Sequence, residues 1–184
     1  MYFAHDTEIA LAESAALVNT LSDGVDSLAD QAGLDAFFVQ FPFSGRILRT
    51  DEELVEVRQL RAKLRSLWSA RDRAEAAAIV NEILADADAR PYLTKHDEYD
   101  WHLHVTHPDA PLAQRIGAEA AMGFLDLIRA DDLDRLRICA ADDCEDVVVD
   151  LSRNKSKLYC ATGNCGNRAN VAAYRARKRS GTAR

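Results

Sequence analysis

The sequence predicts a mainly α-helical fold with a small β-hairpin, an α+β class, followed by a small cysteine-containing module. Three observations predict it. Apolar residues recur at helical spacing through most of the N-terminal part, whereas one segment near residue 100 alternates in steps of two. All four cysteines of the chain then fall within residues 139–165. We therefore expect an alanine-rich helical domain over residues 1–136 and a separate module over residues 137–184.

The bulk composition suits a folded protein with room for one domain and a small module. The 184 residues are 48% hydrophobic and 29% charged, which is ordinary for a globular chain that buries a core. No stretch approaches the roughly 18 apolar residues of a membrane-spanning helix, so no membrane partner is expected. The N-terminal segment carries early acids and no basic region, unlike a secretory signal. We therefore expect a cytoplasmic protein, whose thiols stay reduced.

Five segments of the N-terminal part carry apolar residues at helical spacing. We expect Thr7 to cap the first helix. The third begins with Thr50 and Glu53 in the spacing of a capping box, in which the two side chains satisfy exposed backbone N–H groups. Pro42 and Pro91 follow the second and fourth segments and predict where those helices end. The predicted helices cover residues 7–21, 26–41, 50–72, 74–88 and 110–132.

The segment from Tyr92 to Val105 has a different period. Its apolar residues alternate on both sides of a polar turn near residues 97–100, which predicts a β-hairpin. On such a strand His102 and His104 share one face, and that pair would suit a metal ion. No nearby carboxylate spacing completes the ligand set, so we interpret these histidines as part of a polar exposed face.

The cysteines form two pairs of identical spacing, in the pattern C-x4-C-x15-C-x4-C. Two close pairs separated by a loop of this size supply the four thiolates that a tetrahedral metal ion needs. Zinc suits four thiolates, and a site without a vacant position is structural. Two disulfides or four unpaired thiols are the alternatives, and disulfides conflict with the missing secretory signal. The sequence thus predicts one structural zinc ion held by Cys139, Cys144, Cys160 and Cys165.

The spacer and the tail predict how this module folds. Residues 147–151 and 157–160 are expected to form two strands of a hairpin with its turn at residues 152–156, as in a treble-clef or ribbon-like finger. Asn167 is a good helix N-cap and predicts a helix from Arg168 to about Arg179. We expect Val171 and Tyr174 of that helix to pack on the zinc hairpin.

Charge is distributed unevenly along the chain. Residues 1–136 carry 13 Lys and Arg against 25 Asp and Glu, a net charge of −12, whereas residues 137–184 carry 10 against 5, a net charge of +5. A basic tail on an acidic body is typical of a nucleic-acid-binding arm, and a solvated, disordered tail is the alternative. The candidate contacts to nucleic acid are Arg153, Lys155, Lys157, Arg168, Arg175, Arg177, Lys178 and Arg179.

The stretch CAADDCEDVVVDLSRNKSKLYCATGNCGNR resembles the CGNR zinc finger, which is named for the motif at Cys165-Gly166-Asn167-Arg168. The N-terminal part is similar to the ABATE domain, whose early Val-Asn-Thr signature matches Val18-Asn19-Thr20. The resemblance implies a stress-induced transcription regulator, with DNA binding inferred from the basic finger. Acids at 142, 143, 145 and 146 make the first cysteine knuckle acidic, a departure that weakens the expected grip on phosphate. Asn19 and Thr20 would line a pocket or, as such residues more often do, satisfy a helix end.

These observations predict a DNA-binding transcription regulator whose basic module contacts the DNA backbone. The helical domain would sense a small molecule or form a homodimer, and the sequence names no ligand for it. The alternative is a zinc-stabilised assembly module whose basic helix docks on an acidic protein surface, in its own chain or in a partner. We expect no enzyme, because the chain has no Gly-rich phosphate loop, nucleophile elbow or catalytic triad.

Overall fold

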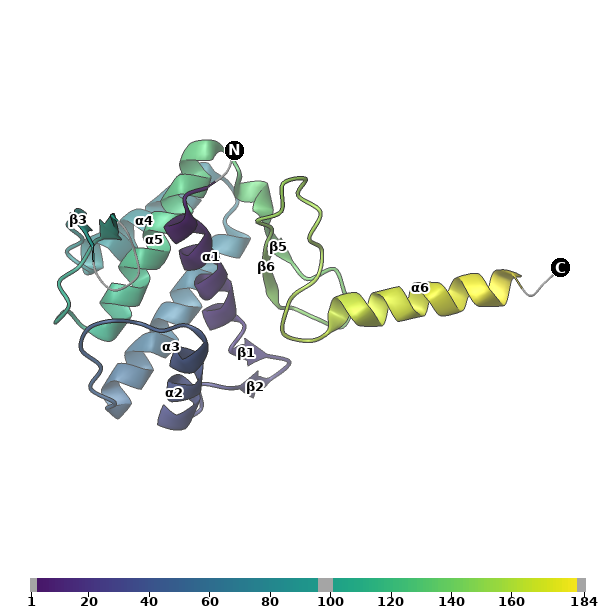
Figure 1. Ribbon diagram of the computed structural model, residues 1–184, viewed down its shortest axis with the longest axis horizontal. Helices are drawn as coiled ribbons and strands as arrows, with labels where there is room; N and C mark the ends of the chain where they lie inside the picture. Colours follow the sequence, from purple (N-terminus) through teal and green to yellow (C-terminus); the bar gives the residue numbers. More distant parts are fainter. Residues whose placement is uncertain (1–2, 96–100, 182–184) are drawn as a thin grey trace.

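The computed structural model describes residues 3–95 and 101–181. It shows a rounded helical body from which one long helix projects at the C-terminal end (Figure 1). The predicted turn near residues 97–100 lies outside the described residues. Helices occupy His5–Val18 (α1), Gln31–Gln40 (α2), Asp51–Arg65 (α3), Arg73–Asp86 (α4), Leu112–Ala130 (α5) and Cys165–Gly181 (α6), with short 3-10 turns at Ser66–Ser69 and Leu133–Arg135.

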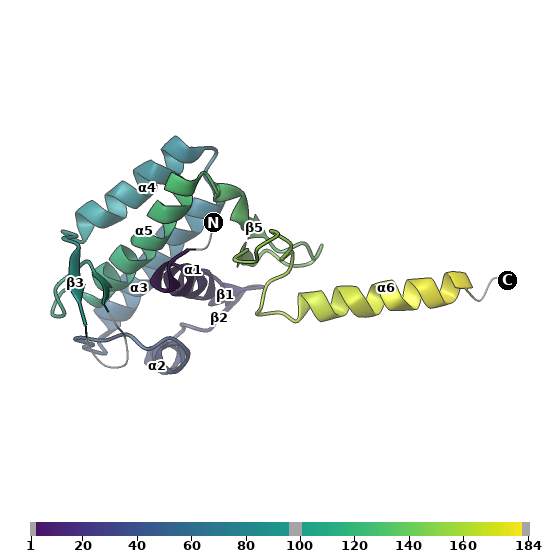
Figure 2. The same cartoon turned by 45° about the horizontal axis from the view of Figure 1, so that its top comes forward.

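Helix α5 lies at the centre of the body, where it packs against α1, α3 and α4 (Figure 2). Its inward side chains include Phe124, which is fully buried and meets the ring of Trp68 edge to face at 5.4 Å between ring centroids. Leu11 of α1 and Leu64 of α3 are also fully buried. Burial of one such side chain stabilises the folded protein by about 1.5–3 kcal/mol relative to leaving it exposed. This is why the apolar stripes of the sequence assemble into one core.

The helix starts follow local capping chemistry. Thr50 caps α3 as expected, and its hydroxyl accepts the N–H of Glu53 at 3.3 Å. The Glu53 carboxylate accepts the N–H groups of Leu48 and Arg49 instead of returning to Thr50. The prediction that Thr7 caps α1 is wrong, because the helix begins at His5 and the Thr7 hydroxyl donates to Asp126 on α5 at 2.6 Å.

Helix α2 begins five residues later than predicted because the preceding segment forms a small hairpin. Strands β1 (Leu21–Ser22) and β2 (Val25–Asp26) pair antiparallel around Asp23 and Gly24, whose φ angles of 49° and 76° define a tight turn. The guanidinium of Arg61 on α3 binds both carboxylate oxygens of Asp26, at 2.6 and 2.9 Å. This ion pair holds the hairpin against the body.

The predicted hairpin near residue 100 is confirmed. Strands β3 (Tyr92–Thr94) and β4 (His102–His104) pair antiparallel, with Leu93 opposite Leu103. This hairpin leaves large apolar side chains in solvent, among them Leu93 and Trp101.

A third hairpin corrects the prediction for the cysteine module. Strand β6 (Val147–Val149) pairs with β5 (Leu136–Ile138), not with residues 157–160, which form no strand. All three valines of β6 are buried: Val147 and Val149 belong to the helical core, and Val148 packs among the cysteines. Strand β5 follows directly on the short 3-10 turn after α5, and its Leu136 packs against the helical core, whereas Lys157 and Leu158 are exposed.

Hydrogen bonds fasten this hairpin to the helical body. The side-chain amide of Asn19, at the end of α1, donates to the carbonyl of Val147 at 2.9 Å, and its oxygen accepts the Val147 N–H at 2.8 Å. The indole N–H of Trp68 donates to the carbonyl of Val148 at 3.0 Å. Strand β5 spans the boundary expected at residue 136, so the two parts of the chain share buried contacts there.

We predict that Asn19→Ala lowers the free energy of unfolding by about 2–4 kcal/mol, because it leaves both backbone groups of Val147 buried without partners. Urea unfolding of the zinc-loaded protein measures this change. The matched control is Asn81→Ala, an exposed asparagine on α4 that should change stability by less than about 0.5 kcal/mol. Equal stability of the two variants would show that the Asn19 pair does not fasten the hairpin.

Candidate metal centre

The four predicted cysteines come together at one buried point. Cys139 follows β5, Cys144 lies just before β6, Cys160 ends the long loop and Cys165 opens α6. Their Sγ atoms all lie within 4.8 Å of one another, with 3.8 Å between Cys144 and Cys160 and 3.6 Å between Cys160 and Cys165. Zn–S bonds of about 2.3 Å in a tetrahedron place sulfurs roughly 3.8 Å apart. The donor set therefore fits one structural zinc ion.

Backbone geometry holds the sulfurs in place. The N–H of Cys160 donates to the Cys139 sulfur at 3.4 Å, and the N–H of Cys139 donates to the carbonyl of Asp146 at 2.8 Å. The turn between the last two cysteines is tight at Gly163, where a Cβ would stand 3.2 Å from the Cys165 sulfur. A side chain at this position would therefore press on the ligand cluster.

Burial makes ionisation of these thiols unfavourable unless a cation lies among them. Burial raises the pKa of Cys144 to about 11 and raises that of Cys160 further. Burial also acts to raise the pKa of Cys139, but hydrogen bonds from the N–H groups of Cys160 and Ala141, together with those of the Cys144 and Cys160 thiols, lower that pKa. The buried Asp146 carboxylate has an oxygen without a hydrogen-bond partner among the described residues. A divalent ion among the sulfurs favours the thiolates and offsets the charge of this carboxylate.

Arg168, the last residue of the CGNR motif, lies in contact with the metal centre. Its guanidinium binds both carboxylate oxygens of Asp143, at 2.6 and 3.0 Å, and lies 3.2 Å from the Cys165 sulfur. The hydrogen bonds to Asp143 and Cys165 raise the pKa of Arg168. Four thiolates around Zn²⁺ carry a net charge of −2, so a cation at this position stabilises the cluster. The pair also links α6 to the first knuckle.

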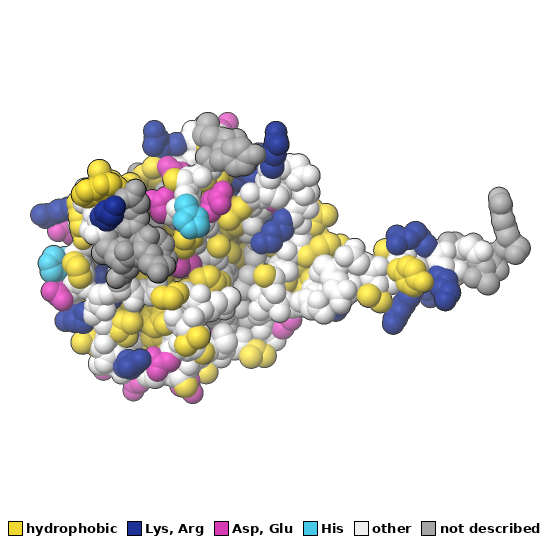
Figure 3. All heavy atoms as spheres, viewed as in Figure 1, with side chains coloured by type: hydrophobic (Ala, Val, Ile, Leu, Met, Phe, Trp, Pro, Cys, Tyr) yellow, Lys and Arg dark blue, Asp and Glu magenta, His cyan; other side chains and the backbone are white. Residues whose placement is uncertain are grey.

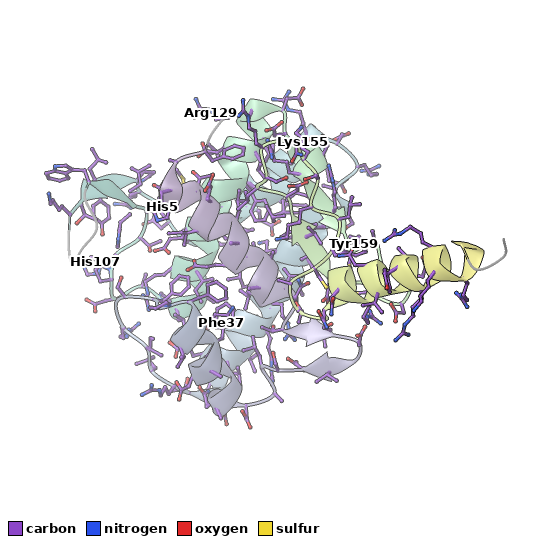
Figure 4. All side chains as sticks on the ribbon, turned by 45° about the vertical axis from the view of Figure 1, so that its right-hand side comes forward. His5, Phe37, His107, Arg129, Lys155 and Tyr159 are labelled. Atoms are coloured by element: carbon purple, nitrogen blue, oxygen red, sulfur yellow. The ribbon has the colours of Figure 1, made fainter. Side chains whose placement is uncertain are left out.

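A second polar network orders the loop between β6 and Cys160. The Asp150 carboxylate is fully buried and accepts the N–H groups of Ser152 and Lys157, at 2.9 and 2.8 Å. Although burial acts to raise the pKa of Asp150, these hydrogen bonds and that of the Ser152 hydroxyl lower it. Lys155 forms ion pairs with Asp134 at 2.6 Å and Asp132 at 2.9 Å. Figure 4 places Tyr159 beside the base of α6 and Lys155 farther along the same loop.

Helix α6 differs from the expectation in two ways. It begins at Cys165, three residues before Arg168, so Asn167 lies inside the helix and does not cap it. Val171 and Tyr174 are 39% and 59% exposed, so the prediction that they pack on the zinc hairpin is wrong. At about 1.5 Å per residue, positions 171 and 174 lie roughly 9 and 14 Å beyond Cys165 along the helix axis. At these positions α6 extends beyond the zinc module.

The predicted nucleic-acid contacts thus fall into two groups. Arg168 and Lys155 are held by carboxylates. The others have exposed side chains on the loop or on α6, where Lys and Arg surround the projecting helix together with hydrophobic side chains (Figure 3). Those exposed cations are Arg153, Lys157, Arg175, Arg177, Lys178 and Arg179.

Within residues 3–95 and 101–181, the four cysteines are the only cluster of three or more His, Cys, Asp or Glu side chains placed to hold a metal. The side chain of His102 lies outside the described part of the chain, so the interpretation of the histidine pair stays a prediction. None of the helices in the same residues is long and apolar enough to cross a membrane.

A helical body joined through a buried hairpin to a four-cysteine zinc site defines the class, a zinc-finger protein with a fused helical domain. Comparison with family models then identifies both parts. The CGNR zinc finger model matches residues 135–178. The ABATE model, described as "Putative stress-induced transcription regulator", matches residues 13–131, which is more than half of the chain. The chain belongs to the ABATE family. A comparison with curated proteins finds no match.

We predict that Arg168→Lys weakens zinc binding about 10–100-fold, because a lysine cannot bind both Asp143 oxygens while it faces the Cys165 sulfur. Competition between the protein and a chromogenic chelator measures the zinc affinity. Arg175→Lys, in an exposed position on the same helix, is the matched control and should retain the parent affinity. If the two variants bind zinc equally well, Arg168 does not support the metal centre.

Proposed function

We propose that this protein is a cytoplasmic DNA-binding transcription regulator in which zinc fixes the base of a basic helix that contacts the DNA backbone. The observation that carries the proposal is α6, a 17-residue helix anchored at the metal centre and exposed beyond it. The family description supports a transcription regulator. Both matched families are regulatory or zinc-finger families, and neither is described as an enzyme.

The dimensions and charge of α6 suit a duplex. A helix of 17 residues is about 25 Å long, and the major groove of B-DNA accepts an α-helix. From Cys165 to Gly181 the sequence has five Lys and Arg and no Asp or Glu. At 100° per residue Arg168, Arg175 and Arg179 fall within about 40° of one another. This stripe would follow one strand of phosphates.

The ion pairs at and near the metal centre separate the proposed DNA contacts into cations that are already paired with carboxylates and cations that are exposed. Arg168 and Lys155 reach a phosphate only where it displaces Asp143 or the pair Asp132 and Asp134. Arg153, Lys157, Arg175 and Arg179 are exposed and form no ion pair within the described residues, so we assign most of the electrostatic affinity to them. The acidic body, with its net charge of −12 over residues 1–136, would repel DNA and direct the duplex toward α6.

Fluorescence anisotropy with a random duplex of about 20 base pairs tests the proposal. We expect the zinc-loaded protein to bind with an affinity that falls steeply with salt, and we expect chelation to abolish binding. Arg175→Ala and Arg179→Ala should each reduce the magnitude of the log–log salt slope by about 0.9, since each removes one phosphate contact. Arg90→Ala, an exposed arginine of the body, is the control and should leave the slope unchanged.

Absence of duplex binding at low salt would contradict the proposal. Binding that survives chelation would contradict the role given to zinc. Single-stranded RNA of equal length serves as the comparison ligand, and tighter binding to it would redirect the proposal to RNA.

A second candidate function is assembly, in which α6 docks on the acidic surface of another protein molecule. The exposed Val171 and Tyr174 favour it, because apolar side chains between cations offer a partner more than charge. In Figures 1 and 2 the helix projects away from the body of its own chain. A gel-filtration shift in high salt, without DNA affinity, would support assembly over DNA binding.

A further inference from the structure

A cavity lies where the helical body meets the zinc module. Its volume is about 530 Å³, which is in the range of sites that hold small organic molecules. Helices α1 and α2 form its walls on the body side, and β6 with residues 157–162 forms the wall on the module side. Neither the fold of the body nor the zinc site uses this space.

Alanines, valines and two phenylalanines form the apolar part of the walls, and the uncharged polar residues beside them are Asn19, Thr20, Ser27, Gln40 and Thr162. Ala12, Ala15 and Ala16 recur at helical spacing on α1 and present a shallow wall to the cavity. Phe37 of α2 and Phe41, the residue after the end of α2, line the cavity with their ring centroids 5.1 Å apart. Larger residues at the alanine positions would fill the space between the two helices. The alanines therefore leave room for an apolar ligand with the dimensions of one or two rings.

The charge of the lining restricts the ligand further. Residues 1–136 contain 25 Asp and Glu, yet none of the residues that line this cavity is acidic. Lys157, from the zinc module, is the one Lys or Arg side chain among the lining residues. A second cavity, of about 500 Å³ between α2 and α3, shows the contrast, because Asp30, Asp51 and Arg58 line it.

We propose that the cavity between α1, α2 and the zinc module binds a small organic anion, a monocarboxylate with an apolar aromatic or aliphatic part. The apolar part lies between the α1 alanines and the α2 phenylalanines, and the carboxylate binds the ammonium group of Lys157. An ion pair at the mouth of an apolar cavity favours the carboxylate over a neutral molecule of the same shape.

Because of where the cavity lies, a bound ligand can influence the metal centre and α6. Lys157, Cys160 and Thr162 line it, and this segment leads directly into Cys165 and α6. A ligand that contacts both α1 and this segment favours the arrangement in which the two lie close together. Resting on the function proposed above, we expect ligand binding to change the affinity for DNA by the same factor as DNA changes the affinity for the ligand.

Isothermal titration of the zinc-loaded full chain tests the site with 2-naphthoate, with decanoate and with the neutral 2-naphthamide. We expect saturable binding of at least one carboxylate at one site per chain, and we expect naphthamide to bind at least about 10-fold more weakly than naphthoate. Lys157→Gln should remove the preference for the carboxylate. Lys178→Gln, which removes a lysine of α6 away from the cavity, should keep it.

A cavity-filling variant provides the independent test. Ala12 is exposed on the wall of the cavity, so Ala12→Phe should fold, retain zinc and lose carboxylate binding at least about 10-fold. Ala78→Phe, at an exposed position on α4, is the matched control and should bind as the parent does. No binding of either carboxylate at millimolar concentration, or equal binding by the two phenylalanine variants, would overturn the proposal.

These titrations contain no DNA, so they test the carboxylate site independently of the proposed DNA-binding function. Carboxylate binding that depends on Lys157 and Ala12 supports the site even if the protein binds no duplex. If the carboxylate and duplex DNA both bind the protein and neither changes the affinity for the other, the coupling between the cavity and α6 is refuted.

Discussion

The burial of strand β6 on both faces is the constraint on which the other features depend. Val147 and Val149 complete the helical core, and Val148 packs among the cysteines. A buried backbone must satisfy its hydrogen-bonding groups, and β5, Asn19 and Trp68 provide those partners. The zinc module is therefore built onto the helical body. Motion of the module relative to the body would expose these valines and break the bonds of Asn19, which links metal binding to the stability of the body.

Buried charged groups hold the loop that follows β6 in a fixed position relative to the body. The guanidinium of Arg135 is buried, binds Asp132 at 2.9 Å and donates to the carbonyls of Asp150 and Ser152. The Asp150 carboxylate in turn orders the turn that carries the basic residues, and Lys155 returns to Asp132. Because buried ion pairs of this kind are costly to break, the loop arrives at Cys160 along a defined path. The same path forms one wall of the α1–α2 cavity, so the cavity and the metal centre share a wall.

Local sequence patterns predicted the helices, the hairpin at β3 and β4 and the cysteine cluster, because spacing and capping are short-range properties. The interactions that the sequence did not predict join residues that lie far apart in the chain. Spacing suggested that residues 157–160 pair with β6, but the continuous run of valines pairs with β5, whose Leu136 packs against the helical core. That apolar run was itself a signal of burial on both faces. The Asp23-Gly24 pair likewise signalled the hairpin of β1 and β2. No local pattern indicates that Asp143 binds Arg168 or that Asn19 binds Val147.

The placement of Arg168 changes how the CGNR motif relates to DNA. Its cysteine is a zinc ligand and its arginine binds Asp143 beside that ligand, so both ends of the motif belong to the metal centre. The acidic first knuckle, which at first suggested a weaker phosphate grip, supplies the carboxylate that this arginine needs. In the proposed function, the part of α6 that contacts a polyanion is the set of cations from Arg175 onward, which lie at least about 15 Å along the helix axis from the metal ligand. At that distance a small rotation of the first turn moves the distal cations by several ångströms. The metal, Arg168 and the loop beside the cavity all act on that first turn, so they decide where the charges of α6 point.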